Sequence, residues 1–185
     1  MIGLSAGYLV PFDGETVSRI RISTSSIPCN TTGHICGNKD YNELLNSYTL
    51  PQMLSTYGLP EHLFLTSDLN VAEPTSPDYF LIRLLYTRLG IFVKYTMPME
   101  IRADTYKFCP SESTIDLELT PQGIGNNYRE FFRQVGDEEW ASIPYTTYDQ
   151  PVEEALGLTN EEFYQLIISS PATCFESPID IWPEP

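Results

Sequence analysis

The stretch YFLIRLLYTRLGIFVKYTM, residues 79–97, contains two apolar runs separated by the turn-forming sequence Arg88-Leu89-Gly90. Residues 79–86 and 91–97 have the composition of β-strands, and the short break between them is typical of a hairpin. Both runs are apolar at odd and at even positions, as in strands that are buried on both faces. The sequence therefore predicts a hairpin at the centre of a sheet, with helices covering one side.

A short helix is predicted before this hairpin. In residues 50–57 the apolar side chains recur at i, i+3, i+4 and i+7 spacing, which places them on one helical face. Thr49 is a suitable N-cap for the helix, and Gly58 followed by Pro60 is a typical stop. A helix of two turns can cover only part of a sheet, so we expect at least one more.

A second helix is predicted for residues 160–168, because Thr159 and Glu162 form the capping-box sequence at its start. In residues 115–119, apolar residues alternate with Asp116 and Glu118, which predicts a strand with one solvent-facing side. Other strands are predicted at residues 63–66 and 99–108, with a hairpin over residues 2–24.

These elements predict an α+β fold, with a mainly antiparallel sheet of about five to seven strands backed by two or three short helices. A chain of 185 residues is long enough for one domain, residues 1–185. Residues 170–185 are rich in proline and apolar residues, and we expect them to lie extended over the body.

The charge is strongly acidic, with 25 Asp and Glu against 10 Lys and Arg and a formal net charge of −15. Such a field repels nucleic-acid phosphates and anionic lipid surfaces, so neither is an expected partner. It favours solubility, or binding to a cationic protein. No apolar run reaches the roughly 18 residues that a transmembrane helix needs. Assembly with further copies of the same chain stays open as an alternative.

The four cysteines all lie in predicted loops or at the end of a strand, at Cys29, Cys36, Cys109 and Cys174. Such positions favour disulfides over buried free thiols, and the closely spaced pairs of a zinc site are absent. Three pairings are possible, and we favour Cys29–Cys36 with Cys109–Cys174. Disulfides predict an extracytoplasmic protein, secreted or at the cell surface, whose leader or anchor lies outside this chain.

The order of elements resembles a known family. A helix ends in the Gly-x-Pro turn Gly58-Leu59-Pro60, and a strand, a loop and the strongly apolar hairpin of residues 80–95 follow. This order is similar to the small bacterial extracytoplasmic lipoproteins of the outer-membrane assembly type, the SmpA/OmlA group, and to the related beta-lactamase-inhibitor-protein fold. The resemblance implies a non-enzymatic protein that holds partner proteins on a helix-backed antiparallel sheet. It also implies that the hairpin within residues 1–24 is the remnant of a preceding unit. It carries over no functional residue, because the shared positions are structural.

Motifs for chemistry occur without the context that they need. Ser5 lies in a G-x-S-x-G sequence, but no helix is predicted after it, as a nucleophile elbow requires. His34 and Cys36 lie in a polar loop, where an exposed histidine beside a disulfide is the simpler interpretation. Residues 68–79 begin like a calcium loop but have Glu73 where glycine is required. We therefore predict no catalytic residue, no cofactor and no metal ligand.

Aromatic residues in the proline-punctuated part of the chain are the candidate partner-binding residues. They are Trp140, Tyr145, Tyr148 and Trp182. Aromatic side chains in loops often anchor a protein interface, although they also serve to cover the open face of a sheet.

The leading hypothesis for function is an extracytoplasmic protein-binding or scaffolding domain without enzymatic activity. Two alternatives stay open: a hydrolase that acts on extracellular or cell-envelope glycans through loop carboxylates, and a structural subunit of a surface assembly. A deep cleft lined by carboxylates would favour the hydrolase.

Overall fold

The fold is known from a computed structural model that describes residues 8–12, 16–23, 47–68, 79–119 and 149–182. Within these residues, one antiparallel sheet contains nine strands. They are β1 (Tyr8–Phe12), β2 (Thr16–Ser23), β3 (His62–Asp68), β4 (Tyr79–Tyr86), β5 (Ile91–Arg102), β6 (Thr105–Phe108), β7 (Thr114–Leu119), β8 (Asp149–Pro151) and β9 (Phe175–Pro178). Seven of them follow the order β1-β2-β7-β5-β4-β3-β8, and β6 joins β9 to β5.

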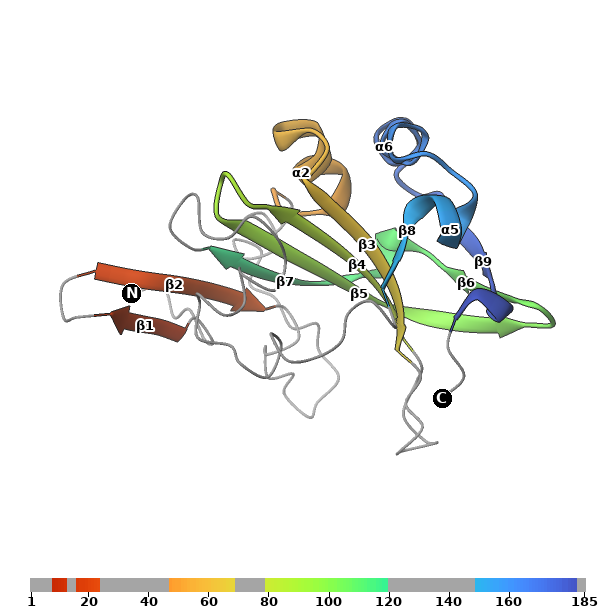
Figure 1. Cartoon of the computed structure of the whole chain (residues 1–185), viewed down its shortest axis with the longest axis horizontal. Coiled ribbons are helices and arrows are strands. Elements are labelled where there is room, and N and C mark those ends of the chain that lie inside the picture. Colours follow the sequence, from red (N-terminus) through yellow and green to blue (C-terminus); the bar gives the residue numbers. More distant parts are fainter. Residues whose placement is uncertain (1–7, 13–15, 24–46, 69–78, 120–148, 183–185) are drawn as a thin grey trace, which may run out of the picture.

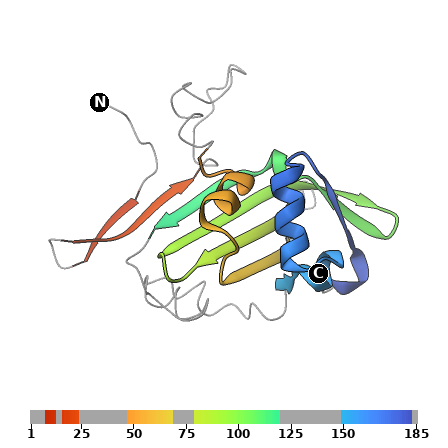
Figure 2. The same cartoon turned by 90° about the horizontal axis from the view of Figure 1, so that it is seen from above.

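The described part of the chain also contains three short helices, α2 (Leu50–Tyr57), α5 (Val152–Leu156) and α6 (Asn160–Ser169). Two 3₁₀ turns, η1 (Pro110–Glu112) and η3 (Ile179–Ile181), follow β6 and β9. All three helices lie on the same side of the sheet (Figure 1), and α2 and α6 lie across the strands when the sheet is seen from above (Figure 2). The predicted α+β class, with a mainly antiparallel sheet and short helices, is confirmed.

The hairpin β4–β5 is central in the sheet, as its two-sided apolar pattern predicted. β4 pairs with β3 on one side and with β5 on the other, and β5 pairs in turn with β7. Alternate residues of β4, such as Phe80, Ile82 and Leu84, join the core beneath the helices. Leu81 and Leu85 lie between them on the second face and are also buried. Burial on both faces follows from the continuous apolar sequence of this strand.

Helix α2 has the predicted bounds and is tied to the sheet at both of its ends. Tyr95 donates a hydrogen bond from its hydroxyl to the carbonyl of Tyr48, before the helix, at 2.8 Å. Tyr86 donates to the carbonyl of Gly58, after the helix, at 2.9 Å. Gly58 has φ of 73°, a conformation that glycine adopts at little cost, and it therefore allows the chain to leave the helix and enter β3.

Helix α6 begins with the predicted capping box. The Thr159 hydroxyl accepts from the backbone N–H of Glu162 at 3.2 Å, and the Glu162 carboxylate accepts from the backbone N–H of Thr159 at 2.8 Å. Its inward stripe contains the fully buried Phe163 and Ile167. The sequence did not predict α5, because its five residues bury only Val152 and Ala155 and give too short a period to recognise.

One predicted strand, residues 99–108, is instead a second hairpin. β5 continues to Arg102, turns at residues 103–104 and returns as β6. Residues 103 and 104, which form this turn, are exposed. In β6 only every second residue, Tyr106 and Phe108, is buried. The hairpin extends past the helix-covered part of the sheet at the end opposite to the hairpin β1–β2 (Figures 1 and 2).

The C-terminal segment packs on the body through residue 182. β9 pairs with β6, and Cys174, just before β9, forms a disulfide with Cys109, just after β6. Trp182 is 5% exposed and packs edge-on against Phe80, with ring centroids 5.2 Å apart. Its indole Nε1 donates a hydrogen bond to the Ser177 hydroxyl at 2.9 Å. The favoured pairing of Cys109 with Cys174 is therefore present in the fold.

Of the features predicted for the N-terminal part of the chain, the structure describes the hairpin but not the two cysteines. The predicted hairpin is present as β1 and β2, and β2 continues the same sheet by pairing with β7. Cys29 and Cys36 lie outside the described residues. No helix among those that the structure describes is long and apolar enough to cross a membrane.

Removing the disulfide is expected to lower stability markedly. The Cys109→Ala/Cys174→Ala variant should lose about 4 kcal/mol of unfolding free energy, because the bond closes a loop with a sequence separation of 65. Urea denaturation of the oxidised wild type and the variant measures this difference. An unchanged unfolding midpoint would show that the contacts of β9 and Trp182 hold the segment without the covalent bond.

Candidate functional site

Charged side chains from three central strands, β4, β5 and β7, lie on the sheet face opposite the helices. Arg83 of β4 lies opposite Lys94 of β5, and Lys94 lies opposite Asp116 of β7. Their positions alternate with those of the core residues, so the pleat of the strands directs them to the second face. A row of charges therefore crosses the centre of the sheet.

Arg83 forms a buried ion pair with Asp149 of β8, across the intervening strand β3. The Arg83 Nη1 to Asp149 Oδ1 distance is 2.5 Å, and the two side chains are 7% and 5% exposed. Thr66 of β3 lies between them: its hydroxyl accepts from Arg83 Nη1 at 3.1 Å and donates to Asp149 Oδ1. This network connects a central strand with the edge strand that leads into α5.

The pKa of Asp149 is raised, mainly because burial disfavours the charged carboxylate. The positive charge of Arg83 and the hydrogen bond from Thr66 lower the pKa and offset that effect only in part. Both Arg83 and Thr66 nevertheless make their contacts with one oxygen of this carboxylate. We conclude that Asp149 is held as a structural partner of the arginine.

The second charged pair joins β5 and β7. Lys94 Nζ lies 2.9 Å from Asp116 Oδ2, and both side chains are mostly buried. Glu118, two residues further along β7, is only 4% exposed. The alternating pattern of this strand predicted that Asp116 and Glu118 face solvent, and for Glu118 that expectation is wrong. An alternating sequence shows which face of a strand is polar. It does not show whether the rest of the fold shields that face from water.

Exposed carboxylates dominate the outer surface of the helices α5 and α6. Residues 149–185 contain no Lys, Arg or His. Their exposed acidic side chains on the two helices are Glu153, Glu154, Glu161 and Glu162. Two described arginines are exposed: Arg88 lies in the turn between β4 and β5, and Arg102 is the last residue of β5. The outer surface of α5 and α6 therefore carries negative charge that no basic residue of its own segment offsets.

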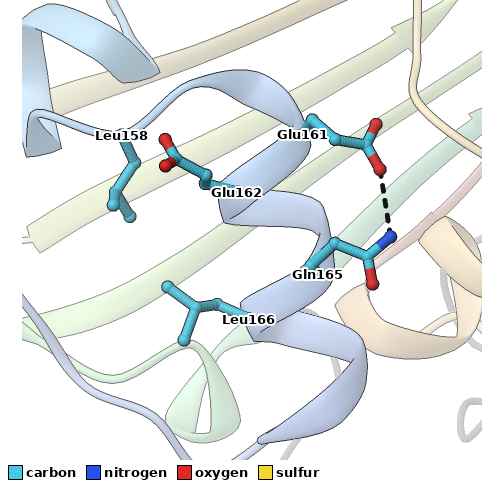
Figure 3. Close-up of a pocket in the computed structure, with 5 residues that line it drawn as sticks. All are labelled: Leu158, Glu161, Glu162, Gln165 and Leu166. Carbon is cyan, nitrogen blue, oxygen red and sulfur yellow. Dashed lines mark hydrogen bonds between the residues drawn. The ribbon is translucent and has the colours of Figure 1, made fainter.

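A shallow hollow of about 300 Å³ lies against the outer side of α6. Its lining residues come from the helix and the residue before its cap, and they are Leu158, Glu161, Glu162, Gln165 and Leu166. Figure 3 shows Leu158, Glu162 and Leu166 along one side of the helix, with Glu161 and Gln165 on the neighbouring side. The surface of the hollow is mainly apolar, although three of its five lining residues, Glu161, Glu162 and Gln165, are polar and exposed.

Both carboxylates of the hollow make hydrogen bonds within the helix. Glu161 accepts from the Gln165 side-chain amide at 3.0 Å (Figure 3), and Glu162 accepts from the backbone and hydroxyl of Thr159. The hydrogen bond from the Thr159 backbone is the largest cause of a lowered pKa at Glu162. Adjacent residues on one helix point in different directions, unlike the facing carboxylates of a glycosidase.

The candidate partner-binding aromatics do not form one exposed surface in the described residues. Trp182 lies in the core with its indole N–H bonded to Ser177, so it stabilises the fold rather than offering a contact surface. Trp140, Tyr145 and Tyr148 lie outside the described residues. Among the residues that the structure describes, no group of three or more His, Cys, Asp or Glu could hold a metal ion.

The acidic helical layer, formed by the exposed glutamates Glu153, Glu154, Glu161 and Glu162 of α5 and α6, was not predicted as a site from the sequence. Its signal was present in the sequence, since the absence of basic residues after Gln150 can be read directly. The hollow itself could not be found in that way, because it requires the position of Leu158 relative to α6. Only the fold brings Leu158 and Leu166 to the same hollow.

Replacing the buried arginine tests the role of the ion pair. Arg83→Met should lower the unfolding free energy by about 3 kcal/mol, because Asp149 then remains buried without its partner charge. The double variant Arg83→Met/Asp149→Leu should regain much of that loss, since no buried charge remains. Arg88→Met, at a side chain that is 86% exposed, is the matched control and should change little. Equal losses for Arg83→Met and Arg88→Met in urea denaturation would contradict this role.

Removing the hydroxyl of the N-cap should raise the pKa of Glu162. Thr159→Ala deletes one of the two contacts that lower it, and NMR titration of the Glu162 carboxylate measures the change. Because the pKa is lower in the folded chain, the contact stabilises α6 above the ordinary carboxyl range, and this stabilisation is lost as the pH falls through the lowered value. An unchanged titration would assign the shift entirely to the Thr159 backbone.

Comparison with known proteins does not assign the chain to a family. No family model, no curated protein and no solved structure matches this sequence or its fold. The resemblance to the SmpA/OmlA group stays a prediction.

Proposed function

We propose that this protein is an extracytoplasmic, non-enzymatic binding domain that recognises a cationic protein partner. The observation that carries the proposal is the acidic helical layer, in which exposed carboxylates of α5 and α6 lie on a segment without a basic residue. A surface of one charge attracts a partner of the opposite charge, speeds their encounter and disfavours partners of like charge.

The helical layer is held rigidly enough to serve as an interface. Its two ends are fixed, one by the ion pair of Asp149 with Arg83 and the other by the disulfide of Cys174 with Cys109. Phe163 and Ile167 bury the inner stripe of α6 in the core. A surface that is already ordered loses little conformational entropy when a partner binds, which favours affinity.

The disulfide supports a location outside the reducing cytoplasm. Such bonds persist in oxidising compartments, and Cys174 is exposed at the surface. An exposed bond would be accessible to reductants in a cytosol, so an extracytoplasmic setting is the one in which this part of the fold stays intact.

The resemblance to the SmpA/OmlA group supports protein binding. The binding surface that it implies, however, differs from the one that we propose. That group is expected to hold partners on the sheet. Here the second face of the central strands buries Leu81, Arg83 and Leu85, whereas the helical layer offers exposed charge. We therefore place the proposed interface on the helices. The adjacent carboxylates of α6 give no support to the alternative of a glycan hydrolase.

Chemical crosslinking in the native source, followed by identification and purification of the crosslinked protein, tests the proposal. The purified partner should be basic, should bind this protein directly, and should bind much more weakly as the ionic strength rises. A variant with all four exposed glutamates of α5 and α6 changed to glutamine should lose most of the binding. An acidic partner, or binding that is indifferent to salt and to this variant, would refute the proposal.

A further inference from the structure

Helix α6 has an outward stripe with the spacing of a helix-docking face. Four residues of the hollow, Glu161, Glu162, Gln165 and Leu166, lie on one face of α6 at i, i+1, i+4 and i+5 positions, and Leu158 flanks this face from before the N-cap. This is the spacing by which one face of a helix meets another helix. The inward stripe, with Phe163 and Ile167, is a different set of residues that already packs on the sheet.

The stripe combines apolar ends with an acidic middle. Leu158 and Leu166 are half-buried at the edge of the core, and the exposed Glu161 and Glu162 lie between them in the sequence. A lysine or arginine can lay its aliphatic stem on the leucines and bring its charged head to the carboxylates. An anionic group would be repelled at the same place.

We propose that this hollow is the docking site for a basic amphipathic helix of the partner protein; the inference rests on the proposed function and names its site. The partner helix places lysine or arginine side chains opposite Glu161 and Glu162, and apolar side chains against Leu158 and Leu166. The helical part of the stripe, from Glu161 to Leu166, spans about 8 Å, or roughly one and a half turns, which matches a short helical segment. The hollow is shallow and open to solvent, so it fits side chains presented by a facing helix better than a ligand that must be enclosed.

A fluorescent helical peptide tests the inference directly. The probe carries leucines at both ends of one face and lysines between them, and the control peptide has glutamate in place of each lysine. Fluorescence anisotropy at low ionic strength should show binding of the lysine peptide to the full chain and none of the glutamate peptide. Backbone amide NMR shifts caused by the lysine peptide should concentrate in residues 158–166.

Two variants with equal changes in charge locate the site. Glu161→Gln/Glu162→Gln should raise the peptide dissociation constant by on the order of fivefold, and glutamine at the position of Glu162 still supports the capping box. Glu153→Gln/Glu154→Gln on α5 removes the same charge outside the hollow and should have a much smaller effect.

The outcomes separate this inference from the proposed function. Equal weakening by both variants, or NMR shifts outside residues 158–166, would overturn docking at the hollow and leave a general attraction to cationic proteins standing. Failure of the lysine peptide to bind at low ionic strength would also overturn it. If no cationic partner is crosslinked in the native source while the peptide binds as expected, the proposed function fails and the peptide site remains.

Discussion

The buried ion pair between Arg83 and Asp149 is the constraint on which the arrangement of the two layers depends. A guanidinium in the middle of a central strand must be paired, because an isolated buried charge costs several kcal/mol. Its partner comes from β8, at the edge of the sheet, and Thr66 fills the space between them. The chain that follows β8 therefore starts from a fixed point when it crosses to the other side as α5 and α6.

From that fixed point, apolar burial determines the rest of the helical layer. Phe163 and Ile167 reach the core beneath α6, and Trp182 closes the core against Phe80. The disulfide of Cys174 holds the segment after α6 beside β6. With the inner stripe committed to the core, the acidic residues of both helices can only face outward. The surface charge is thus a consequence of the same packing that stabilises the fold.

Much of the fold could be predicted because its signals are local. The helix Leu50–Tyr57 and the capping box at Thr159 depend on residues within a few positions of each other. The central hairpin was evident from a continuous apolar sequence. The second hairpin at Arg102 was missed, since its turn lacks glycine and proline, and α5 was missed because five residues show no period.

The sequence by itself determined the α+β class, the central hairpin, the acidic charge and the absence of basic residues from the C-terminal segment. These depend on composition and on short-range periodicity, which a linear chain displays directly. Only the tertiary structure decided that Arg83 pairs with Asp149, that Glu118 is buried and that Trp182 lies in the core. Those facts depend on contacts between residues far apart in the chain, and pairing and burial of a side chain are properties of its neighbours in space.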